Sequence, residues 1–276
     1  MDRLAALLRH FSLSARLFHS GPLCGIHDFA PEPGLGQLHL VRAGTVVARH
    51  HGAAADVEAD GPCLLFYPRP MAHRFECDAL AGPDMACAHV RFGDGPGSPL
   101  AEALPAVVAL PLDQVAGAAP VLEVLFAEAF GARCGRQAVV DRLFEAVLVM
   151  VLRERMSRGR VDAGLLAGLA DPKLARALVA IHEAPATDWS LAALAAQAGL
   201  SRSVFAERFR AVVGITAGDY LARWRIGLAQ HWLRQGRPLK WIAGEVGYAG
   251  EAALSRAFKA RCGIPVREWR RGAVAG

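Results

Sequence analysis

The chain has 276 residues, of which 53% are hydrophobic and 21% are charged, and its formal net charge is +5. This composition indicates a protein that is globular throughout and has room for two domains. No run approaches about eighteen apolar residues without charges, which excludes a membrane-spanning helix.

The N-terminal segment Met1–Phe18 does not have the features of a secretory signal, because charged residues interrupt its leucines and it has no small-residue cleavage site. Apolar residues at helical spacing instead predict a short docking helix: Leu4, Leu7, Leu8 and Phe11. The six cysteines are scattered without framework spacing. Without an export signal we expect reduced thiols and a cytoplasmic protein.

Short apolar runs broken by Gly, Pro and Asp extend from Gly21 to about Leu110. They predict strands at Gln37–Val47, Cys63–Tyr67 and Met85–Phe92, with turns at Arg49–Ala55 and Ala79–Asp84. Many short strands at near-regular spacing are typical of a β-sandwich or barrel. The run Gly61-Pro62-x-x-x-x-x-Pro68-x-Pro70-x-x-His73 resembles the second motif of the cupins, small jelly-roll barrels, whereas the first cupin motif is not recognisable. We therefore expect a cupin-like domain in residues 1–110.

Two helices are predicted next, at Ala116–Phe130 and Gln137–Met156, and they form a helical connector in residues 111–160. The second helix has a broad apolar face made by Val139, Val140, Leu143, Ala146, Val147, Met150 and Val151. Such a helix beside a small barrel either packs on the barrel or forms a dimer seam. The glycines of Ser157–Asp171 predict a linker to the last domain, residues 171–276.

One pattern occurs twice in the last domain, which indicates a duplicated structural unit. The first copy runs Ala195-x-x-Ala198-Gly199-Leu200-Ser201, then Phe205, Phe209, Arg210 and Gly214-Ile215-Thr216. The second copy runs Ala243-x-x-Val246-Gly247-Tyr248, then Leu254, Phe258, Lys259 and Gly263-Ile264-Pro265. Each copy predicts a short helix, a glycine turn and a second helix, with N-caps at Ser190 and Ser201 in the first. This is a helix–turn–helix, which places its second helix in the major groove.

A single helix is predicted to join the two copies. It starts at the capping box Thr216-x-x-Asp219 and ends before Gly236. A helix of about twenty residues is ~30 Å long, close to the roughly 34 Å between major-groove faces one turn apart. The charge agrees, because residues from Asp171 onward hold 16 lysines and arginines against 8 aspartates and glutamates. One chain could therefore read two successive grooves.

These residues carry a resemblance to the DNA-binding domain of the AraC/XylS family of bacterial transcription regulators. The matching runs are Leu191-Ala192-Ala193-Leu194-Ala195, Gly199-Leu200-Ser201, Phe205-x-x-x-Phe209 and Ile242-Ala243-x-x-Val246-Gly247-Tyr248-x-x-x-x-x-Leu254-Ser255-Arg256-Ala257-Phe258-Lys259-x-x-x-Gly263-Ile264-Pro265-x-x-x-Trp269-Arg270. The resemblance implies double-stranded DNA as a partner, with RNA polymerase and a second copy of the chain as further candidates. It also implies that the preceding cupin-like domain is a sensor.

The same resemblance implies which side chains contact bases. They are Ser203, Ala206 and Glu207 in the first reading helix, and Glu251, Ala252, Ser255 and Arg256 in the second. The first set is short or acidic where larger donors often stand, so binding there would rest on Arg202 and Arg210 at phosphates. Lys259 is the further outward-facing cation of the second helix.

Four residues of the predicted barrel could converge on one point: Cys24, His39, His73 and Cys87. Two thiolates and two imidazoles would satisfy tetrahedral Zn²⁺, which is the candidate cofactor. The N-terminal region also resembles the reactive-chlorine-responsive branch of the AraC family, through Met1-Asp2-x-Leu4, Cys24, His39 before Gly44, Ala72-His73 and Cys87. That resemblance implies cysteines that sense oxidant, with Cys24–Cys87 oxidation as the expected switch. The alternative is an apolar pocket for an organic effector, in which buried cysteines only pack.

Together these features predict an α+β multidomain protein with a cupin-like jelly roll, a helical connector and an all-α domain of two helix–turn–helix units. The predicted function is a sequence-specific DNA-binding transcription regulator, not an enzyme, whose cupin domain senses an oxidant, a metal or a small organic ligand. The alternative is a metal-dependent cupin oxygenase or isomerase with an appended DNA-binding module. The missing first cupin motif counts against that alternative.

Overall fold

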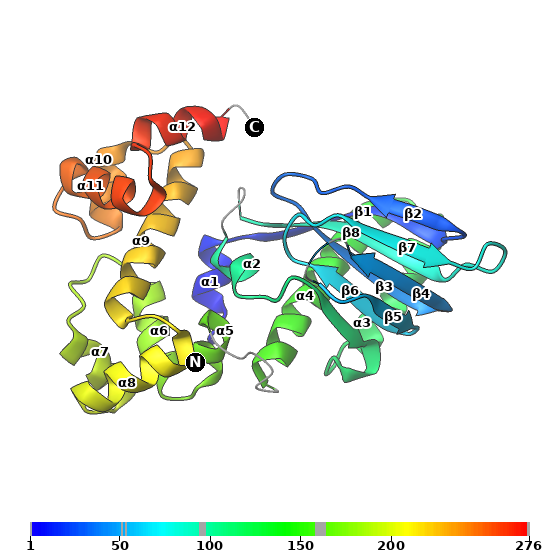
Figure 1. Ribbon diagram of the computed structural model, residues 1–276, viewed down its shortest axis with the longest axis horizontal. Coiled ribbons are helices and arrows are strands. Elements are labelled where there is room, and N and C mark those ends of the chain that lie inside the picture. The colour runs from blue at the N-terminus through cyan, green and yellow to red at the C-terminus, as the bar shows by residue number, and fades with distance from the viewer. Residues whose placement is uncertain (1, 51, 53, 94–97, 158–163, 275–276) are drawn as a thin grey trace. The chain divides into compact units, whose positions relative to one another are not determined.

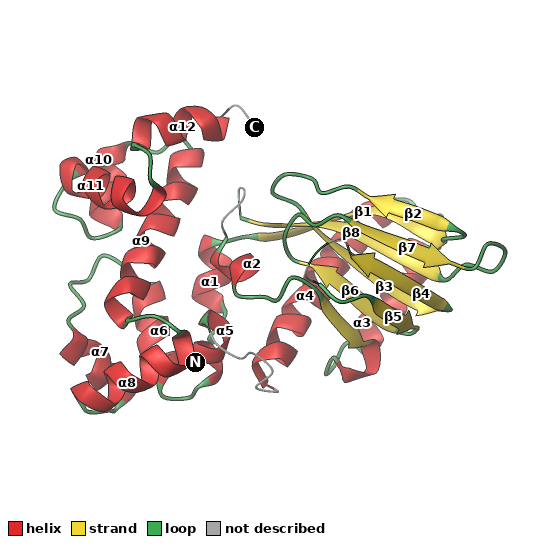
Figure 2. Cartoon of the chain, in the orientation of Figure 1, coloured by secondary structure: helices red, strands yellow, loops and turns green. Residues whose placement is uncertain are grey.

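The computed structural model describes residues 2–50, 52, 54–93, 98–157 and 164–274 of the chain (Figure 1). The chain forms two compact units, one from Ser12–Arg160 and the other from Met1–Phe11 together with Val161–Gly276. The first is rich in strands and the second is helical (Figure 2). No helix among the described residues is long and apolar enough to cross a membrane.

The first unit is a sandwich of two antiparallel sheets, which confirms the predicted jelly roll. The five-stranded sheet has the order β1 (Leu13–Pro22), β8 (Asp84–Phe92), β3 (Gly36–Ala43), β6 (Cys63–Tyr67) and β9 (Val108–Pro111). The four-stranded sheet has the order β2 (Ile26–Phe29), β7 (His73–Cys77), β4 (Thr45–His50) and β5 (Val57–Asp60). Short helical segments follow β8 and β9, at α2 (Pro99–Glu102) and η1 (Leu112–Gln114).

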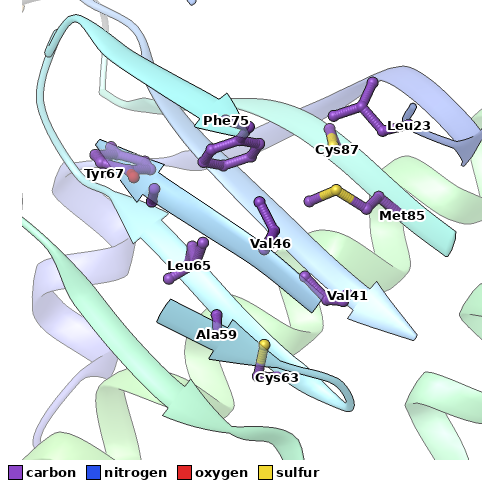
Figure 3. Packing of buried hydrophobic residues seen from close by; sticks show 11 residues of the cluster. Leu23, Val41, Val46, Ala59, Cys63, Leu65, Tyr67, Phe75, Met85 and Cys87 are labelled. Atoms are coloured by element: carbon purple, nitrogen blue, oxygen red, sulfur yellow. The ribbon is translucent and has the colours of Figure 1, made fainter. Parts of the chain in front are cut away.

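Alternation along the strands divides the buried residues between two faces. Leu65, Tyr67, Phe75, Met85 and Cys87 belong to the core between the sheets, and Figure 3 shows Cys87 near Leu23 and Met85. The opposite face of the five-stranded sheet is also apolar. Its buried residues include Leu38, Leu40, Leu64 and Phe66. In Figure 1 the helices α3 (Ala119–Ala129) and α4 (Arg136–Ser157) lie against this sheet, so it is covered on both faces.

Side chains of α4 satisfy the free edge of strand β1. Leu17 N–H donates to Asp141 Oδ1 at 2.8 Å, and Ala15 N–H donates to Glu145 Oε1 at 3.4 Å. Gln137 completes the row, since its Nε2 donates to the Leu17 carbonyl at 3.2 Å. Residues 137, 141 and 145 are spaced by one helical turn, so one stripe of α4 bonds alternate residues of the strand. An edge strand with its backbone groups bonded in this way is protected from pairing with another chain.

The structure differs from the sequence prediction in three places. The predicted strand Gln37–Val47 is two strands, because Gly44 takes a φ of +86° and lies where a Cβ would be 2.9 Å from Pro83 Cα. The predicted linker contains a helix, α5 (Leu165–Ala170), whose leucines Leu165, Leu166 and Leu169 are buried. Residues 158–163 of that linker lie outside the described residues. Unlike the predicted domain of residues 1–110, the sandwich unit begins at Ser12 and includes α3 and α4.

The second unit contains both predicted helix–turn–helix pairs. Their helices are α7 (Leu191–Ala198) with α8 (Arg202–Val213), and α10 (Leu239–Glu245) with α11 (Glu251–Cys262). The long α9 (Ala217–Arg234) joins them, as Figure 1 shows, and α6 (Leu174–Glu183) and α12 (Val266–Val274) complete the unit.

The predicted caps of the first pair are present. Ser190 Oγ accepts from Ala193 N–H at 3.1 Å, and Ser201 Oγ accepts from Val204 N–H at 3.4 Å. Thr216 Oγ1 accepts from Asp219 N–H at 3.1 Å at the start of α9. Gly199 has a φ of +63°, which confirms the left-handed turn residue. The second pair has a longer turn, between Glu245 and Glu251, and α11 begins without a side-chain cap because Gly250 precedes it.

The N-terminal helix α1 (Ala5–His10) folds with the helical unit. Leu7 is fully buried, and the Phe11 ring meets the Trp224 ring of α9 edge-on at 5.3 Å between centroids. Arg3 donates to the carbonyls of Leu169 and Ala170, which end α5. The predicted docking helix therefore exists, and its partner is the unit that holds the helix–turn–helix pairs.

The two turn glycines offer a matched stability test. A Cβ at Gly199 would meet nothing within 4 Å, whereas a Cβ at Gly247 (φ +74°) would lie 2.6 Å from the Ala186 carbonyl oxygen. We expect Gly199→Ala to cost about 1 kcal/mol from left-handed strain. Gly247→Ala should cost about 1–3 kcal/mol more, because backbone must move as well. Unfolding free energies from urea titration measure both, and equal costs would contradict the predicted close approach.

Candidate nucleic-acid interface and sensor site

Helices α8 and α11 each bury one apolar face and expose the opposite face. Phe205 and Phe209 of α8 are fully buried, as are Leu254 and Phe258 of α11. The ten residues predicted to face DNA lie on the remaining surface of these helices. Eight are exposed, and two, Ala206 and Ser255, are half-buried. Both helices therefore present a surface on which most side chains are polar or charged.

The cations on these helices fall into two groups. Within the described residues, four have no hydrogen-bond or ion-pair partner in the protein: Arg202, Arg210, Arg256 and Lys259. In contrast, Arg208 pairs with Asp171 at 2.6 Å, and Arg261 pairs with Asp219 at 2.9 Å. The paired arginines hold helices of the unit together. The four unpaired cations are all among the predicted DNA-contacting residues, and they remain available for phosphate or base acceptors.

The sequence prediction missed one residue of this surface. Val204 is 48% exposed, next to Ser203 and one turn before Arg208. With Phe205 and Phe209 facing inward, a helix of 3.6 residues per turn places Val204 on the outward side. An exposed apolar side chain on such a helix suits contact with a thymine methyl group. The helical period alone could have identified it.

The connecting helix α9 has the length that the two-groove interpretation needs. Its 18 residues correspond to about 27 Å, slightly shorter than the ~30 Å expected from sequence. Trp224 near its middle is buried, and its ring lies 4.1 Å from that of His182 in α6. His182 Nε2 and the Tyr220 hydroxyl share a hydrogen bond of 2.6 Å. The helix is thus held along its length by packing as well as by its own backbone.

In the sandwich unit, His39 and His73 meet in the interior. Their Nε2 atoms are 3.1 Å apart, and His73 Nδ1 lies 2.9 Å from the Met71 carbonyl oxygen. A carbonyl only accepts, so His73 carries its proton on Nδ1 and accepts at Nε2. His39 consequently donates from Nε2, which leaves its buried Nδ1 as an acceptor with no partner. Burial lowers the pKa of His73 to about 4 and that of His39 well below its usual value, so both rings are neutral.

Aromatic rings enclose this histidine pair. His73 is stacked between Tyr67, at 3.8 Å between centroids, and Phe29, at 4.9 Å. The rings of Phe29 and Phe75 also pack edge-on against His39. Rings on this many sides hold both imidazoles in place. Protonation of either would place a charge in an apolar cage.

The four residues predicted to bind zinc are not brought together. His39 contacts His73, and Cys87 lies directly opposite His39 on the neighbouring strand. Cys24 is exposed and lies beside the far end of β7, where Cys77 N–H donates to the Gly25 carbonyl at 2.9 Å. His73 and Cys77 are four residues apart on β7, about 13 Å at the rise of a strand. In the described part of the chain no group of three or more His, Cys, Asp or Glu side chains could hold a metal ion. Zinc binding by these four stays a prediction that would require rearrangement.

Cys77 is one of the four cysteines that the sequence prediction assigned to no site. Its pKa is raised to about 11 by burial, with a smaller contribution from nearby Cys24. The pKa of Cys87 is raised further, again by burial first and by Cys77 second. We call Cys24, Cys77 and Cys87 the thiol series, in order of increasing burial. The hydrogen bond from Cys77 N–H to the Gly25 carbonyl places Cys77 beside Cys24. Only the strand pairing places Cys77 there, and no sequence signal marks it.

The comparisons with known proteins agree with the two units. A family model described as Cupin matches residues 2–157, and one described as Helix-turn-helix domain matches residues 194–272. A putative AraC-like transcription regulator of Streptomyces antibioticus is 33% identical over 98% of this chain and 97% of the relative. A protein of the same description from Streptomyces lividans is 46% identical over 48% of this chain, and the match spans only 44% of that relative. The RCS-specific transcriptional activator RclR of Escherichia coli is 30% identical over 52% of this chain and 51% of the relative.

The buried histidine pair predicts a pH-dependent stability. Unfolded His73 titrates near 6.5 and folded His73 near pH 4, so the unfolded chain binds the proton first as the pH falls. The stability that neutral His73 allows is complete above about pH 6.5 and is lost progressively toward pH 4, by about 3 kcal/mol. In His73→Gln the amide can accept from His39 but does not titrate. We expect the stability gap between the wild type and His73→Gln to narrow as the pH falls from 7.5 to 4.

Urea unfolding of the full chain at several pH values measures this gap, and the contributions of histidines distant from His73 cancel in the difference. Phe75→Leu is the matched control, because it perturbs the same cage without removing a titrating group, and its gap should not change with pH. A His73→Gln gap that is constant with pH would contradict the neutral buried pair.

Proposed function

Since the chain belongs to the AraC-like transcription regulators, we propose that it reads two successive major grooves of duplex DNA. A cupin domain precedes its helix–turn–helix domain, and an effector sensed by this sandwich unit would control the binding. The relatives reported above are all named as transcription regulators, which favours this function over a cupin enzyme.

The observation that carries the proposal is the distribution of unpaired cations in the helical unit. Arg202 and Arg210 on α8, and Arg256 and Lys259 on α11, have no partner among the described residues. A cation without an internal partner that is kept on a surface helix is available to neutralise phosphate. Two such helices joined by α9 give the spacing needed for adjacent grooves on one face of the duplex.

We assign different roles to the residues of the two reading helices. In α8, Arg202 and Arg210 contact phosphates, while Ser203, Ala206 and Glu207 face the bases and Val204 adds an apolar contact. In α11, Arg256 is the side chain suited to bidentate contact with guanine, beside Glu251, Ala252 and Ser255, and Lys259 contacts phosphate. Sequence discrimination should therefore come mostly from α11, and α8 should contribute affinity more than specificity.

Arg210 and Arg208 of α8 form a matched pair for testing the interface. Arg210 is unpaired, whereas Arg208 is held by Asp171. With a duplex selected by the full chain from a random pool, Arg210→Gln should weaken binding several-fold. It should also reduce the slope of log affinity against log salt by about one unit, because one phosphate contact is lost.

Arg208→Gln removes the same charge but should leave the salt slope unchanged while lowering thermal stability. Fluorescence anisotropy from 50 to 300 mM salt, read at several concentrations of each variant, separates the two effects. If both variants change the slope equally, binding depends on net charge alone and the proposed phosphate contact is wrong.

We also propose that the sandwich unit senses an oxidant through Cys24. The E. coli relative is described as RCS-specific, and its match covers about half of each chain. Cys24 is the exposed member of the thiol series, and Cys77 is the thiol next to it. The resolving partner is therefore Cys77 rather than the Cys87 expected from sequence, which is fully buried.

The proposed oxidation of Cys24 consumes one hypochlorous acid. Hypochlorous acid transfers Cl⁺ to the Cys24 sulfur and the thiol proton leaves with hydroxide as water. The Cys77 sulfur then attacks the Cys24 sulfur, chloride leaves, and the Cys77 proton is released. The products are one disulfide, chloride, water and a proton, with two electrons passing from sulfur to chlorine.

Peptide mapping without reductant, after treatment with one equivalent of hypochlorite, identifies the linkage. We expect a Cys24–Cys77 disulfide in the wild type and in Cys87→Ser, and none in Cys77→Ser. A Cys24–Cys87 disulfide in the wild type would instead support the pairing expected from sequence. Oxidation confined to Cys134 or Cys262 would contradict a sensor role for Cys24.

Two further partners are proposed, a second copy of the chain and RNA polymerase. Most of the apolar face of α4 is used inside the unit, because Val140, Phe144, Val147 and Val151 are fully buried. A second copy of the chain would therefore use the stripe of Val139, Leu143, Ala146 and Met150, which is exposed or half-buried. RNA polymerase stays a partner implied by membership of the family.

A further inference from the structure

A cavity of about 710 Å³ lies along the edge strand of the sandwich. Residues of β1, β8 and α4 line it, together with Glu32 and Leu35 from the segment between β2 and β3. Its volume is within the range of sites for small organic molecules. It is separate from the reading helices and from the thiol series of Cys24, Cys77 and Cys87.

The charges that line the cavity are unequally satisfied. On the α4 side, Asp141 and Glu145 accept hydrogen bonds from the backbone of β1, and Glu145 also pairs with Arg142 at 2.9 Å. Within the described residues, Arg16 and Arg91 have neither a hydrogen-bond nor an ion-pair partner, although both line the cavity. Glu32 also lines the cavity, and its carboxylate lies 3.8 Å from His89 Nε2. Arg16 and Arg91 are therefore the cations of the lining that remain available to an anion.

Strand register places these two arginines on one face of the sheet. Arg16 is opposite His89, and Ser14 is opposite Arg91, so Arg16 and Arg91 are diagonal neighbours on β1 and β8. Diagonal neighbours of an antiparallel pair are about 7–8 Å apart, within reach of one another for long side chains. Ala15 and Leu17 point the other way, toward α4, and their backbone N–H groups bond the Asp141 and Glu145 carboxylates at the α4 side of the cavity. Two guanidinium groups can thus hold a single carboxylate between them.

An aromatic side chain forms the adjacent wall. The bulge between Leu17 and His19 leaves Phe18 unpaired, and its ring lies 4.3 Å from that of His89 with an angle of 35°. Phe18 is 39% exposed, which is unusual for a phenylalanine that lines a cavity. Its free face suits stacking by a planar apolar group. His89 Nδ1 is buried without a hydrogen-bond partner and can meet a polar substituent of that group.

We infer that this cavity binds a small aromatic carboxylate, with the carboxylate held by Arg16 and Arg91 and the ring stacked on Phe18. The inference deepens the sensor role proposed above, since it names the chemical class of an organic effector. Strand β1 and helix α4, which line the cavity, are each close in sequence to a segment of the helical unit. Ser12 alone separates Phe11 from β1, and α4 ends at Ser157 shortly before that unit resumes. A ligand held here therefore acts on the two segments that connect the units.

Calorimetric titration of the full chain with indole-3-acetate and with indole-3-acetamide, its neutral isostere, tests the inference. We expect the acid to bind with a dissociation constant below 1 mM, roughly, and at least about tenfold more tightly than the amide, because charge-assisted hydrogen bonds are stronger than neutral ones. Arg16→Gln and Arg91→Gln should each weaken the acid about tenfold or more and leave the amide unchanged. Phe18→Ser should weaken both ligands.

Arg74→Gln is the matched control, since Arg74 lies on the other sheet, pairs with Asp28 and removes the same charge. It should bind the acid like the wild type. Circular dichroism melting and binding of the selected duplex verify that each variant is folded. Equal binding of acid and amide would overturn the inference, as would tight acid binding in Arg16→Gln, Arg91→Gln double variants. No binding of either ligand at millimolar concentration would also overturn it.

Binding of the selected duplex, measured on the same variants, separates failure of the cavity assignment from failure of the DNA-reading function. Failure of ligand binding in a chain that still binds the duplex rejects the cavity alone. Failure of duplex binding in a folded chain that binds the acid rejects the DNA-reading function and leaves the cavity assignment standing.

Discussion

The helical unit depends on the burial of one side of α9. Trp224 packs against His182 of α6 and against Phe11 of the N-terminal segment, so three parts of the chain meet on one helix face. Burial lowers the pKa of His182 to about 3 and raises that of Tyr220, so the hydrogen bond between them joins two neutral groups at ordinary pH. Neutral partners in an apolar setting give a contact that salt does not screen. The interval between α8 and α11 is therefore set by packing that the high charge of a DNA-binding surface does not disturb.

Strand β1 has a corresponding role in the sandwich. Its inner face carries Arg16 and Phe18, its outer face packs toward α4, and its free edge is bonded by Asp141 and Glu145. Exposed edge strands are prone to pairing with other chains, and here carboxylates at one-turn spacing occupy the backbone donors instead. Those donors are bonded by side chains, which move more easily than a neighbouring strand.

Local chemistry explains what could be predicted from sequence. The helix caps were predictable because Ser190, Ser201 and Thr216 each bond a backbone N–H three residues further along the chain. Gly199 was predictable because its role depends only on its own left-handed φ. The strand Cys63–Tyr67 was predicted at its observed limits because both of its faces are buried and it reads as one apolar run. In contrast β1, β2, β5, β7 and β9 were not predicted. Strands that are half-exposed or contain Gly and Pro carry a weak signal, and their identity comes from neighbours that are distant in sequence.

For the candidate sensor residues, the sequence predicted which face of the sheet each residue takes but not its position along that face. His39 and His73 were expected to face inward and do meet, because alternation along a strand settles which face a residue takes. How far along that face each residue lies depends on register, which sequence does not give, and register places Cys24 beside Cys77 and away from His73. The interior is accordingly divided. One end, around Leu65 and Met85, is apolar and serves stability.

The other end keeps Gln37 Oε1, His39 Nδ1 and His89 Nδ1 buried without partners. Each unpaired buried polar atom costs about 1–3 kcal/mol. Gln37 is opposite His89 on the next strand and two residues from His39, so the three form one group beside the cavity that holds Arg16 and Arg91. Other buried polar atoms without a hydrogen-bond partner lie elsewhere, including His182 Nδ1 and Trp224 Nε1 of the helical unit. His89 is the member of this group that lines the cavity, so its Nδ1 is the atom that a ligand bound there could pair. Such a contact would recover part of the cost of leaving that atom unpaired in the empty protein.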